Sequence, residues 1–258
     1  MSRVLLYLLG NLFLLYVHSE TLERISRGQA ANEGQFPYIV GLALERNDRC
    51  FFCGGTIIAN DWILTAARCT KGVSLVIIYY GSTQYREAPV TVEVYAPGNI
   101  IQHPKFEESN VIKNDISLIR TAWVDFTPYI QSIALPKPDQ RGEQLVGQWY
   151  TAMGWGKTNS AVTADRLQWV SLEVISSSLC RYYYGKIPAG VMCMSTEETK
   201  QSICKGDFGG PLVHEKDKIL IGISSFVPHN GCEAGYPAGF ARVSEYLDWI
   251  RENTGVTS

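Results

Sequence analysis

Short apolar segments separated by glycine, proline and asparagine recur along most of the chain. Residues 56–67 predict two strands joined by a polar turn at Asn60 and Asp61, because β-branched and aromatic residues flank that turn. The same pattern recurs in residues 73–82, 90–101, 115–122, 149–156, 167–175, 211–226 and 239–243. Many short strands with regular turns favour an all-β protein, either a barrel or a sandwich.

Only the C-terminal end of the chain has a helical pattern. In residues 243–253 the apolar side chains recur at the i, i+3, i+4 and i+7 spacing of a helix face, namely Val243, Tyr246, Leu247 and Ile250. Ser244 is the expected N-cap residue. The pattern therefore predicts a mostly β fold that ends in one α-helix.

The N-terminus carries a targeting pattern. Arg3 precedes an apolar run over residues 4–17, and small and polar residues follow that run. We interpret residues 1–19 as a signal peptide and expect a secreted, extracellular protein. The alternative is a transmembrane anchor. It is disfavoured because Gly10 and Asn11 interrupt the run, which falls short of the roughly 20 residues that a span needs.

Composition excludes several classes of function. The 258 residues carry a formal net charge of −2 and contain no run of lysine and arginine. A nucleic acid or an anionic membrane is therefore not an expected partner. No glycine-rich phosphate-binding motif occurs, and we expect no cofactor.

Seven cysteines are present: Cys50, Cys53, Cys69, Cys180, Cys193, Cys204 and Cys232. In a secreted protein they are expected to form disulfides, and an odd number leaves one unpaired. Cys50 and Cys53 have the spacing of a metal-binding pair. No second such pair of cysteines or histidines accompanies them, so we expect no metal site.

Several ordered motifs carry a resemblance to a known family. They are CGGTIIANDWILTAA at residues 53–67, NDISLI at 114–119, GWG at 154–156, GDFGGPLV at 206–213, PAGFARV at 237–243 and the terminal YLDWI segment. Each motif is weak alone, but together, in this order and spacing, they are specific. From about Ile25 to its C-terminus the chain resembles the chymotrypsin/trypsin-like serine proteases (peptidase family S1).

The resemblance implies an all-β fold of two six-stranded antiparallel β-barrels packed on a central cleft, with a C-terminal α-helix. It also implies a short propeptide at residues 20–24 and a trypsin-like domain at residues 25–258. Arg24 and Ile25 match the family's activating cleavage site, and the freed Ile25 ammonium would pair with Asp207. The alternative is that Arg24 is an ordinary basic residue and that no cleavage occurs.

The resemblance also locates the catalytic triad, two members of which are replaced. The family motif TAAHC reads TAARC at residues 65–69, so Arg68 stands at the position of the general base. The family motif GDSGGP reads GDFGGP at residues 206–211, so Phe208 stands at the position of the nucleophile. Asp115 matches the aspartate that orients the base in the family.

Neither replacement can carry out the original chemistry. The nucleophile must be a weakly acidic hydroxyl, and a benzyl side chain has none. The base must accept a proton near pH 7, whereas a guanidinium stays protonated because its pKa exceeds about 12. His103, His214 and His229 are not expected to replace the base, and Cys204 is expected in a disulfide.

Other site positions follow from the resemblance. Gly206 and Phe208 belong to the oxyanion loop. Ser202 stands at the floor of the specificity pocket, where a serine implies a preference for large apolar side chains, as in chymotrypsin. The remaining pocket positions are Ser225, Val227 and Ala238. A branched residue at position 227, where the family has glycine, implies a narrow pocket.

The resemblance pairs six of the cysteines. The implied disulfides are Cys53–Cys69, Cys180–Cys193 and Cys204–Cys232. Cys50 is left unpaired. It is a free, partly buried thiol, a local competitor of Cys53, or a bridge to another chain.

Two hypotheses concern the replaced triad positions. Arg68 and Asp115 are expected to form an ion pair, because a buried carboxylate needs a partner and a guanidinium can bind it through two hydrogen bonds. The alternative leaves Arg68 in solvent and gives Asp115 only hydroxyl or backbone donors. Phe208 is expected to lie across the cleft and plug it, and the alternative is drift after loss of selection for activity.

These features together predict a catalytically inactive serine protease homologue that acts by binding, for example as a cofactor or decoy in an extracellular protease cascade. The expected partner is an extracellular protein such as a protease, an inhibitor or another cascade component, and no membrane anchor is expected. The alternative is an active secreted serine-type endopeptidase of chymotrypsin-like specificity. A third possibility is a purely structural secreted protein.

Overall fold

The computed structural model describes residues 28–108, 112–138, 145–157, 164–198 and 200–258. The expected signal peptide (1–19), the propeptide (20–24) and the cleavage site at Arg24 and Ile25 lie outside these residues and remain predictions. Within the described ranges, no helix is both long and apolar enough to span a bilayer.

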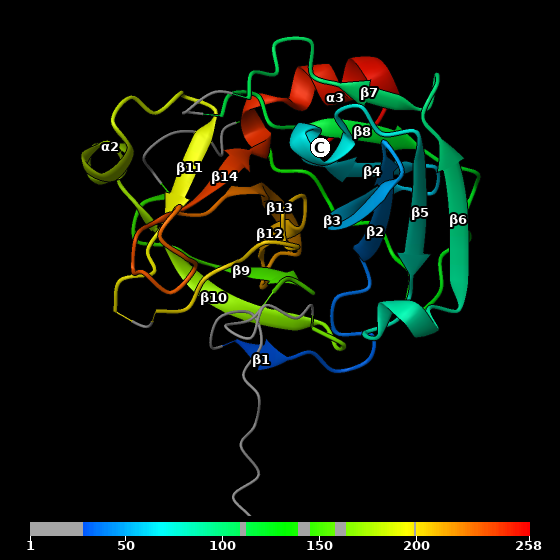
Figure 1. The fold of residues 1–258 in the computed structure, drawn as a ribbon, viewed down its shortest axis with the longest axis horizontal. Helices are drawn as coiled ribbons and strands as arrows, with labels where there is room; N and C mark the ends of the chain where they lie inside the picture. Colours follow the sequence, from blue (N-terminus) through cyan, green and yellow to red (C-terminus); the bar gives the residue numbers. More distant parts are fainter. Residues whose placement is uncertain (1–27, 109–111, 139–144, 158–163, 199) are drawn as a thin grey trace, which may run out of the picture.

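The first half of the described domain is an open antiparallel sheet of seven strands (Figure 1). Its spatial order is β6-β5-β2-β3-β4-β8-β7, so β6 and β7 are its edges. The strands are β2 (Ile39–Arg46), β3 (Arg49–Ala59), β4 (Trp62–Thr65), β5 (Leu75–Tyr80), β6 (Val90–Tyr95), β7 (Ile100–Gln102) and β8 (Ser117–Arg120). The turn predicted at Asn60 and Asp61 joins β3 to β4.

The second half is a closed barrel. Its strands are β9 (Trp149–Gly154), β10 (Gln168–Ile175), β11 (Val191–Met194), β12 (Pro211–His214), β13 (Ile219–Phe226) and β14 (Ala238–Arg242). Pairing of β9 with β10 closes the ring, and β1 (Gln29–Ala30) adds a further strand to β10. The expected all-β fold of two barrels is confirmed. The first barrel, however, is a half-barrel, and each described sheet has seven strands rather than six.

The two halves share one hydrophobic core. Alternate residues of β5 are buried, namely Val76, Ile78 and Tyr80, which is the pattern of a strand with one buried face. The cluster of buried side chains that contains them continues to Trp155 and Ile223 of the second half. A second cluster, which includes Phe240, fills the closed barrel.

Each end of the described chain contacts the half that is remote from it in sequence. β1 pairs with β10 of the closed barrel, whereas α3 (Leu247–Thr254) packs beside β7 and β8 of the first half (Figure 1). Leu247 and Ile250 belong to the shared core. The ring centroid of Trp249 lies 5.3 Å from that of His103, which follows β7.

The C-terminal helix begins later than its apolar pattern predicts. Val243–Glu245 form a 3-10 helix, and the α-helix begins at Leu247 with Tyr246 as its N-cap and no side-chain capping hydrogen bond. The prediction that Ser244 caps the helix is therefore wrong. Its hydroxyl is buried and has no hydrogen-bond partner among the described residues.

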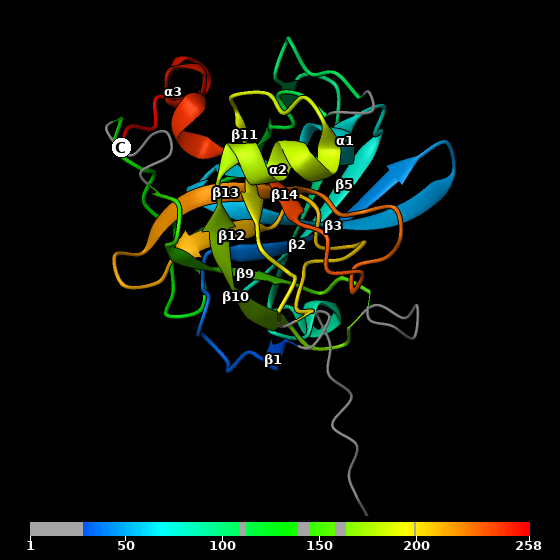
Figure 2. The same ribbon diagram turned by 90° about the vertical axis from the view of Figure 1, so that its left-hand side faces the viewer.

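The apolar pattern also fails to predict a helix on the outside of the closed barrel, α2 (Ser177–Tyr184; Figure 2). Cys180 is its one buried residue, so the helix has no apolar stripe to recognise. Its ends do carry helix signals. The Ser176 hydroxyl accepts the Leu179 N–H at 3.2 Å, and Gly185 follows the last turn.

Phe240 is fully buried in the core of the closed barrel. We predict that Phe240→Ala lowers the free energy of unfolding by about 3–5 kcal/mol, because it removes apolar contacts and leaves a cavity. Tyr182→Ala, at a residue of α2 that is 82% exposed, should change it by less than about 0.5 kcal/mol. Urea denaturation measures both variants, and equal losses would contradict the placement of Phe240 in the core.

Candidate functional site

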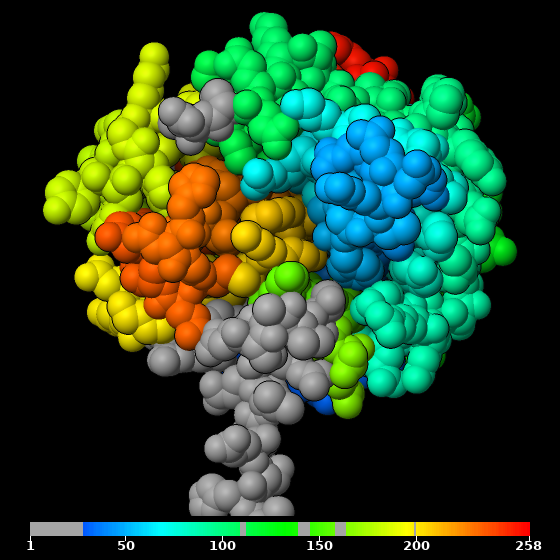
Figure 3. Space-filling view, viewed as in Figure 1, coloured from blue at the N-terminus to red at the C-terminus, as the bar shows by residue number. Residues whose placement is uncertain are grey.

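Three separate segments bring Arg68, Asp115 and Phe208 together. Arg68 lies in the short helix α1 (Ala67–Thr70), Asp115 just precedes β8, and Phe208 lies in the loop between β11 and β12. The Arg68 N–H donates to Asp115 at 2.8 Å. The guanidinium carbon of Arg68 lies 4.6 Å from the centroid of the Phe208 ring. In Figure 3 the gold segment, which includes this loop, lies at the surface between the two halves.

Asp115 is buried, with 2% of its surface exposed. Its Oδ1 accepts the Arg68 N–H at 2.8 Å, and its Oδ2 accepts the Ser225 hydroxyl at 2.6 Å. Burial raises the pKa of Asp115 to about 6, against the opposite effect of these two hydrogen bonds and of the Arg68 charge. The carboxyl group thus has one donor from each half of the domain.

The Arg68 side chain does not pair with Asp115, so the expected ion pair is wrong. None of the ion pairs within the described ranges joins the two side chains. Instead, Arg68 Nη1 donates to the Ser225 carbonyl oxygen and the guanidinium lies over the Phe208 ring. Asp115 keeps only a hydroxyl and a backbone donor, as in the alternative expectation, but Arg68 does not extend into solvent. Both carboxyl oxygens already have donors, which leaves the guanidinium to interact with the aromatic ring.

Phe208 projects from a loop that is bound to both halves of the domain. Its carbonyl oxygen accepts the Gly54 N–H at 2.8 Å, and the Gly209 N–H donates to the Ser224 carbonyl oxygen at 2.8 Å. Gly209 has a φ of 81°, and a Cβ there would clash with the Gly54 carbonyl oxygen, so glycine is required for this approach. The Phe208 ring is partly buried against the shared core. Its role as a plug of the cleft stays a prediction.

Asp207, the neighbour of Phe208, is fully buried. It accepts the N–H of Gly156 at 2.7 Å and the N–H of Cys204 at 2.8 Å. Burial raises the pKa of Asp207 to about 7 in spite of these hydrogen bonds. A Cβ on Gly156 would overlap the carboxyl group, which explains a glycine in the GWG motif. The expected cationic partner, the Ile25 ammonium, lies outside the described residues, so the activation mechanism stays a prediction.

Three of the predicted specificity-pocket positions, Ser225, Val227 and Ala238, lie in or next to β13 and β14. Phe226 pairs with Gly239 across these strands, which places Val227 and Ala238 at adjacent positions. Val227 packs against the core of the closed barrel. Ser202 is fully buried, and its hydroxyl has no hydrogen-bond partner among the described residues. The preference for large apolar residues and the narrowing by Val227 stay predictions.

Tyr184, which is not among the predicted site residues, packs against this region. Its ring centroid lies 5.2 Å from that of Phe226, and its hydroxyl donates to the Pro237 carbonyl oxygen. The residue lies in α2, the helix that the apolar pattern does not predict. A run of three tyrosines at positions 182–184, ending in Gly185, is the signal that could have pointed to it.

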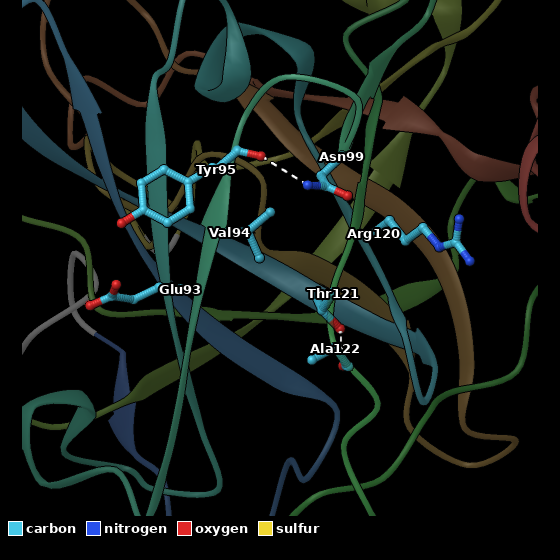
Figure 4. A pocket seen from close by; sticks show the side chains of 7 residues that line it. All are labelled: Glu93, Val94, Tyr95, Asn99, Arg120, Thr121 and Ala122. Atoms are coloured by element: carbon cyan, nitrogen blue, oxygen red, sulfur yellow. Dashed lines mark hydrogen bonds between the residues drawn. The ribbon is translucent and has the colours of Figure 1, made fainter.

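A separate hollow of about 260 Å³ opens on the first half (Figure 4). It is lined by Glu93, Val94, Tyr95, Asn99, Arg120, Thr121 and Ala122. None of these is a predicted site residue, so the hollow is not part of the candidate site. Within the described ranges, no group of three histidine, cysteine, aspartate or glutamate side chains could hold a metal ion.

None of the three histidines in the described ranges forms a hydrogen bond or ion pair with Asp115, as the expected absence of a replacement base requires. His103 packs against two aromatic rings, with centroids 5.4 and 5.3 Å away, and burial lowers its pKa. His214 lies 2.9 Å from Asp217, and His229 is exposed. The hydrogen bonds to Asp115 come from Arg68 and Ser225 instead.

The predicted disulfides are confirmed. The bonded pairs are Cys53–Cys69, Cys180–Cys193 and Cys204–Cys232. Cys50 is free and exposed on β3, rather than partly buried. Because Cys53 is bonded to Cys69, Cys50 does not compete for that partner. A bridge from Cys50 to another chain stays a prediction.

Comparison with known families matches residues 25–250 to the family described as Trypsin. The chain belongs to the trypsin family. A Drosophila melanogaster protein named Serine protease 1 is 43% identical over 235 residues, which cover 91% of this chain and 87% of that protein. A Hypoderma lineatum protein named Collagenase is 40% identical over 238 residues, which cover 90% and 88%. A solved structure of HL collagenase has a TM-score of 0.84 and 38% identity, and the match covers 91% of this chain and 100% of that one.

Membership of the trypsin family confirms the resemblance drawn from the motifs, and the three disulfides are consistent with secretion. The assignment of Arg68, Asp115 and Phe208 to triad positions, and of Gly206 to the oxyanion loop, remains a prediction from the trypsin-family motifs. The structure adds that the side chains of Arg68 and Phe208 contact each other beside the buried Asp115.

We predict that Ser225→Ala is more destabilising than Arg68→Met. The first variant leaves an oxygen of the buried Asp115 without a donor and should lower the free energy of unfolding by about 1–3 kcal/mol. The second keeps the backbone donor and should lose about 1 kcal/mol, mainly from the contact with the Phe208 ring. Urea denaturation ranks the two variants. A larger loss in Arg68→Met would show that the guanidinium, not the hydroxyl, stabilises the carboxylate.

The raised pKa of Asp207 predicts a pH dependence of stability in the chain not cleaved after Arg24. The folded chain holds this proton more tightly than the unfolded chain, in which the pKa is about 3.9. The stabilisation from the protonated group is therefore fully present below about pH 4 and is lost as the pH rises through about 7. The unfolding free energy of wild type, measured relative to Asp207→Asn, should fall over this range. A difference that is independent of pH would contradict this.

Proposed function

We propose that this chain is a secreted, catalytically inactive member of the trypsin family that acts by binding an extracellular protein. The observation that carries the proposal is the contact between Arg68 and Phe208, at the positions of the general base and the nucleophile. The guanidinium carbon lies 4.6 Å from the ring centroid. Neither side chain can accept the proton or supply the hydroxyl that acyl transfer requires. Losing the same triad lowers the turnover of subtilisin, a serine protease of unrelated fold, by about 10⁶-fold.

The other parts of the fold remain fit for binding. The loop at residues 206–210 keeps its hydrogen bonds to both halves, and three disulfides fix the surrounding segments. Such a scaffold suits a cofactor or a decoy in an extracellular protease cascade, with a protease, an inhibitor or another cascade component as partner. The exposed Cys50 thiol offers a route to a covalent link with such a partner.

The names of the relatives favour a second candidate, an active secreted serine-type endopeptidase of chymotrypsin-like specificity. Relatives that are 43% and 40% identical are named Serine protease 1 and Collagenase. This candidate needs a nucleophile and a base other than Phe208 and Arg68. We favour the binding function, because the hydrogen bonds to Asp115 come from groups that cannot serve as that base.

A gain-of-function experiment tests the proposal. The double variant Arg68→His, Phe208→Ser should react with a fluorophosphonate probe and cleave chymotrypsin substrates after the chain is cut behind Arg24. The reason is that Asp115, Ser225 and the loop at residues 206–210 are already in place. Wild type and each single variant should do neither.

Two outcomes contradict the proposal. The first is turnover of a peptide substrate by purified wild type that is abolished by a substitution within the chain. The second is labelling of wild type by the fluorophosphonate probe. Failure of the double variant alone, with wild type inert, would show that more than the triad has been lost, and would leave the endopeptidase candidate excluded.

A further inference from the structure

The guanidinium of Arg68 is held in place but is mostly unused as a donor. It carries five N–H groups. Within the described ranges the guanidinium forms one hydrogen bond, from Nη1 to the Ser225 carbonyl oxygen. The Phe208 ring supports one face of the planar group, with 4.6 Å between the guanidinium carbon and the ring centroid. Arg68 and Phe208 are both partly exposed, so a ligand can reach the pair.

The buried carboxyl group beside Arg68 does not use the remaining donors. Both oxygens of Asp115 accept hydrogen bonds from other groups, the Arg68 main chain and the Ser225 hydroxyl. Asp115 is 2% exposed and lies behind the arginine, away from solvent. The accessible part of this pair is therefore the cation.

The rim beside Arg68 carries charges of both signs. Glu108 binds Lys71 at 2.8 Å, and the Lys71 backbone carbonyl accepts a hydrogen bond from Arg46 at 2.9 Å. The hydrogen bond from Lys71 lowers the pKa of Glu108, and the charges of Lys71, Arg68 and Arg46 act in the same direction. Three cations thus act on this one carboxylate. The neighbouring hairpin adds two carboxylates, Glu45 and Asp48, and one cation, Arg49, so the site is distinguished by the exposed donors of Arg68 and not by an excess of positive charge.

The loop that carries Phe208 adds neutral donors. The backbone N–H groups of Gly206 and Phe208 form no hydrogen bond with any residue that the structure describes. A turn with unpaired N–H groups favours an anion. The Ser225 carbonyl, by contrast, is already bound to Arg68, so a ligand that needs this acceptor for its own N–H would have to displace the arginine.

We propose that Arg68, stacked on Phe208, is the centre of a binding site for a carboxylate group of a peptide ligand. The inference rests on the proposed non-catalytic function and names the ligand chemistry of the same site. A guanidinium fixed by an aromatic ring and one hydrogen bond has little freedom left to lose when it binds a planar carboxylate through two further N–H groups. The carboxylate can come from the C-terminus of a peptide or from an acidic side chain.

Fluorescence anisotropy with three labelled peptides tests the site and separates the two sources. The first peptide has neutral side chains and a free C-terminal carboxylate, the second is its C-terminal amide, and the third is the amide with one internal glutamate. Either carboxylate peptide should bind the purified wild-type chain about tenfold or more tightly than the neutral amide, as expected for a charge-assisted hydrogen bond. The peptide that shows the difference identifies the source.

Matched arginine variants separate a specific site from general charge. Arg68→Gln should abolish the preference for carboxylate, and Arg68→Lys should reduce it, because lysine keeps the charge without the planar fork. Arg120→Gln should leave it unchanged. Arg120 also lies over an aromatic ring, at 6.0 Å from Trp62, but in a different part of the first half. Thermal unfolding of each variant verifies that it is folded.

The inference is overturned if the neutral amide binds as tightly as both carboxylate peptides, if no peptide binds, or if the preference survives in Arg68→Gln. These outcomes are distinct from failure of the proposed function, which would appear as peptide turnover or fluorophosphonate labelling by wild type. An inert chain with no preference for carboxylate would refute only the ligand assignment.

Discussion

The structure at the centre of the molecule depends on which groups donate hydrogen bonds to one buried carboxyl group, that of Asp115. Asp115 takes a main-chain N–H from α1 and a hydroxyl from the end of β13, and these two elements belong to different halves of the domain. Both bonds hold whatever side chain stands at position 68, because the donor there is the backbone. A residue that cannot act as a base is therefore compatible with an intact frame around the aspartate. The hydrogen bonds that hold Asp115 therefore do not depend on the side chain at position 68.

The two replaced residues also compensate for each other. Without Phe208, the guanidinium at position 68 would be partly desolvated and would lack an aromatic ring to stack on. Without Arg68, the ring at position 208 would lack a side chain that covers its face. Stacked at 4.6 Å, each covers part of the other. Their effects are therefore expected to be coupled, as for any two residues in contact. Either substitution alone would leave a less well packed site than the pair.

The fold and the disulfides could be predicted from the motifs, whereas side-chain directions could not. Segments rich in β-branched and aromatic residues coincide with β5, β8, β9 and β10. Burial alternates along β5 and β10, as in a half-buried strand, whereas β8 and β9 are buried almost throughout. β1 is too short to recognise, β2 and β11 lie outside the predicted segments, and α2 buries only one residue fully, Cys180. The motifs correctly predict that Arg68 and Asp115 lie next to each other. They could not show that Ser225 supplies the second hydrogen bond to the carboxyl group, and this is why the predicted ion pair is absent.

Each end of the described chain packs on the half that is remote from it in sequence, and this matters for a molecule cut once between β8 and β9. Each disulfide lies wholly on one side of that connection, so no covalent bond would link the two fragments. Yet the N-terminal fragment would still supply β1 to the barrel, and the C-terminal fragment would still cover the open sheet with α3. These contacts would keep the two fragments associated without a covalent bond, and separating them would require denaturation.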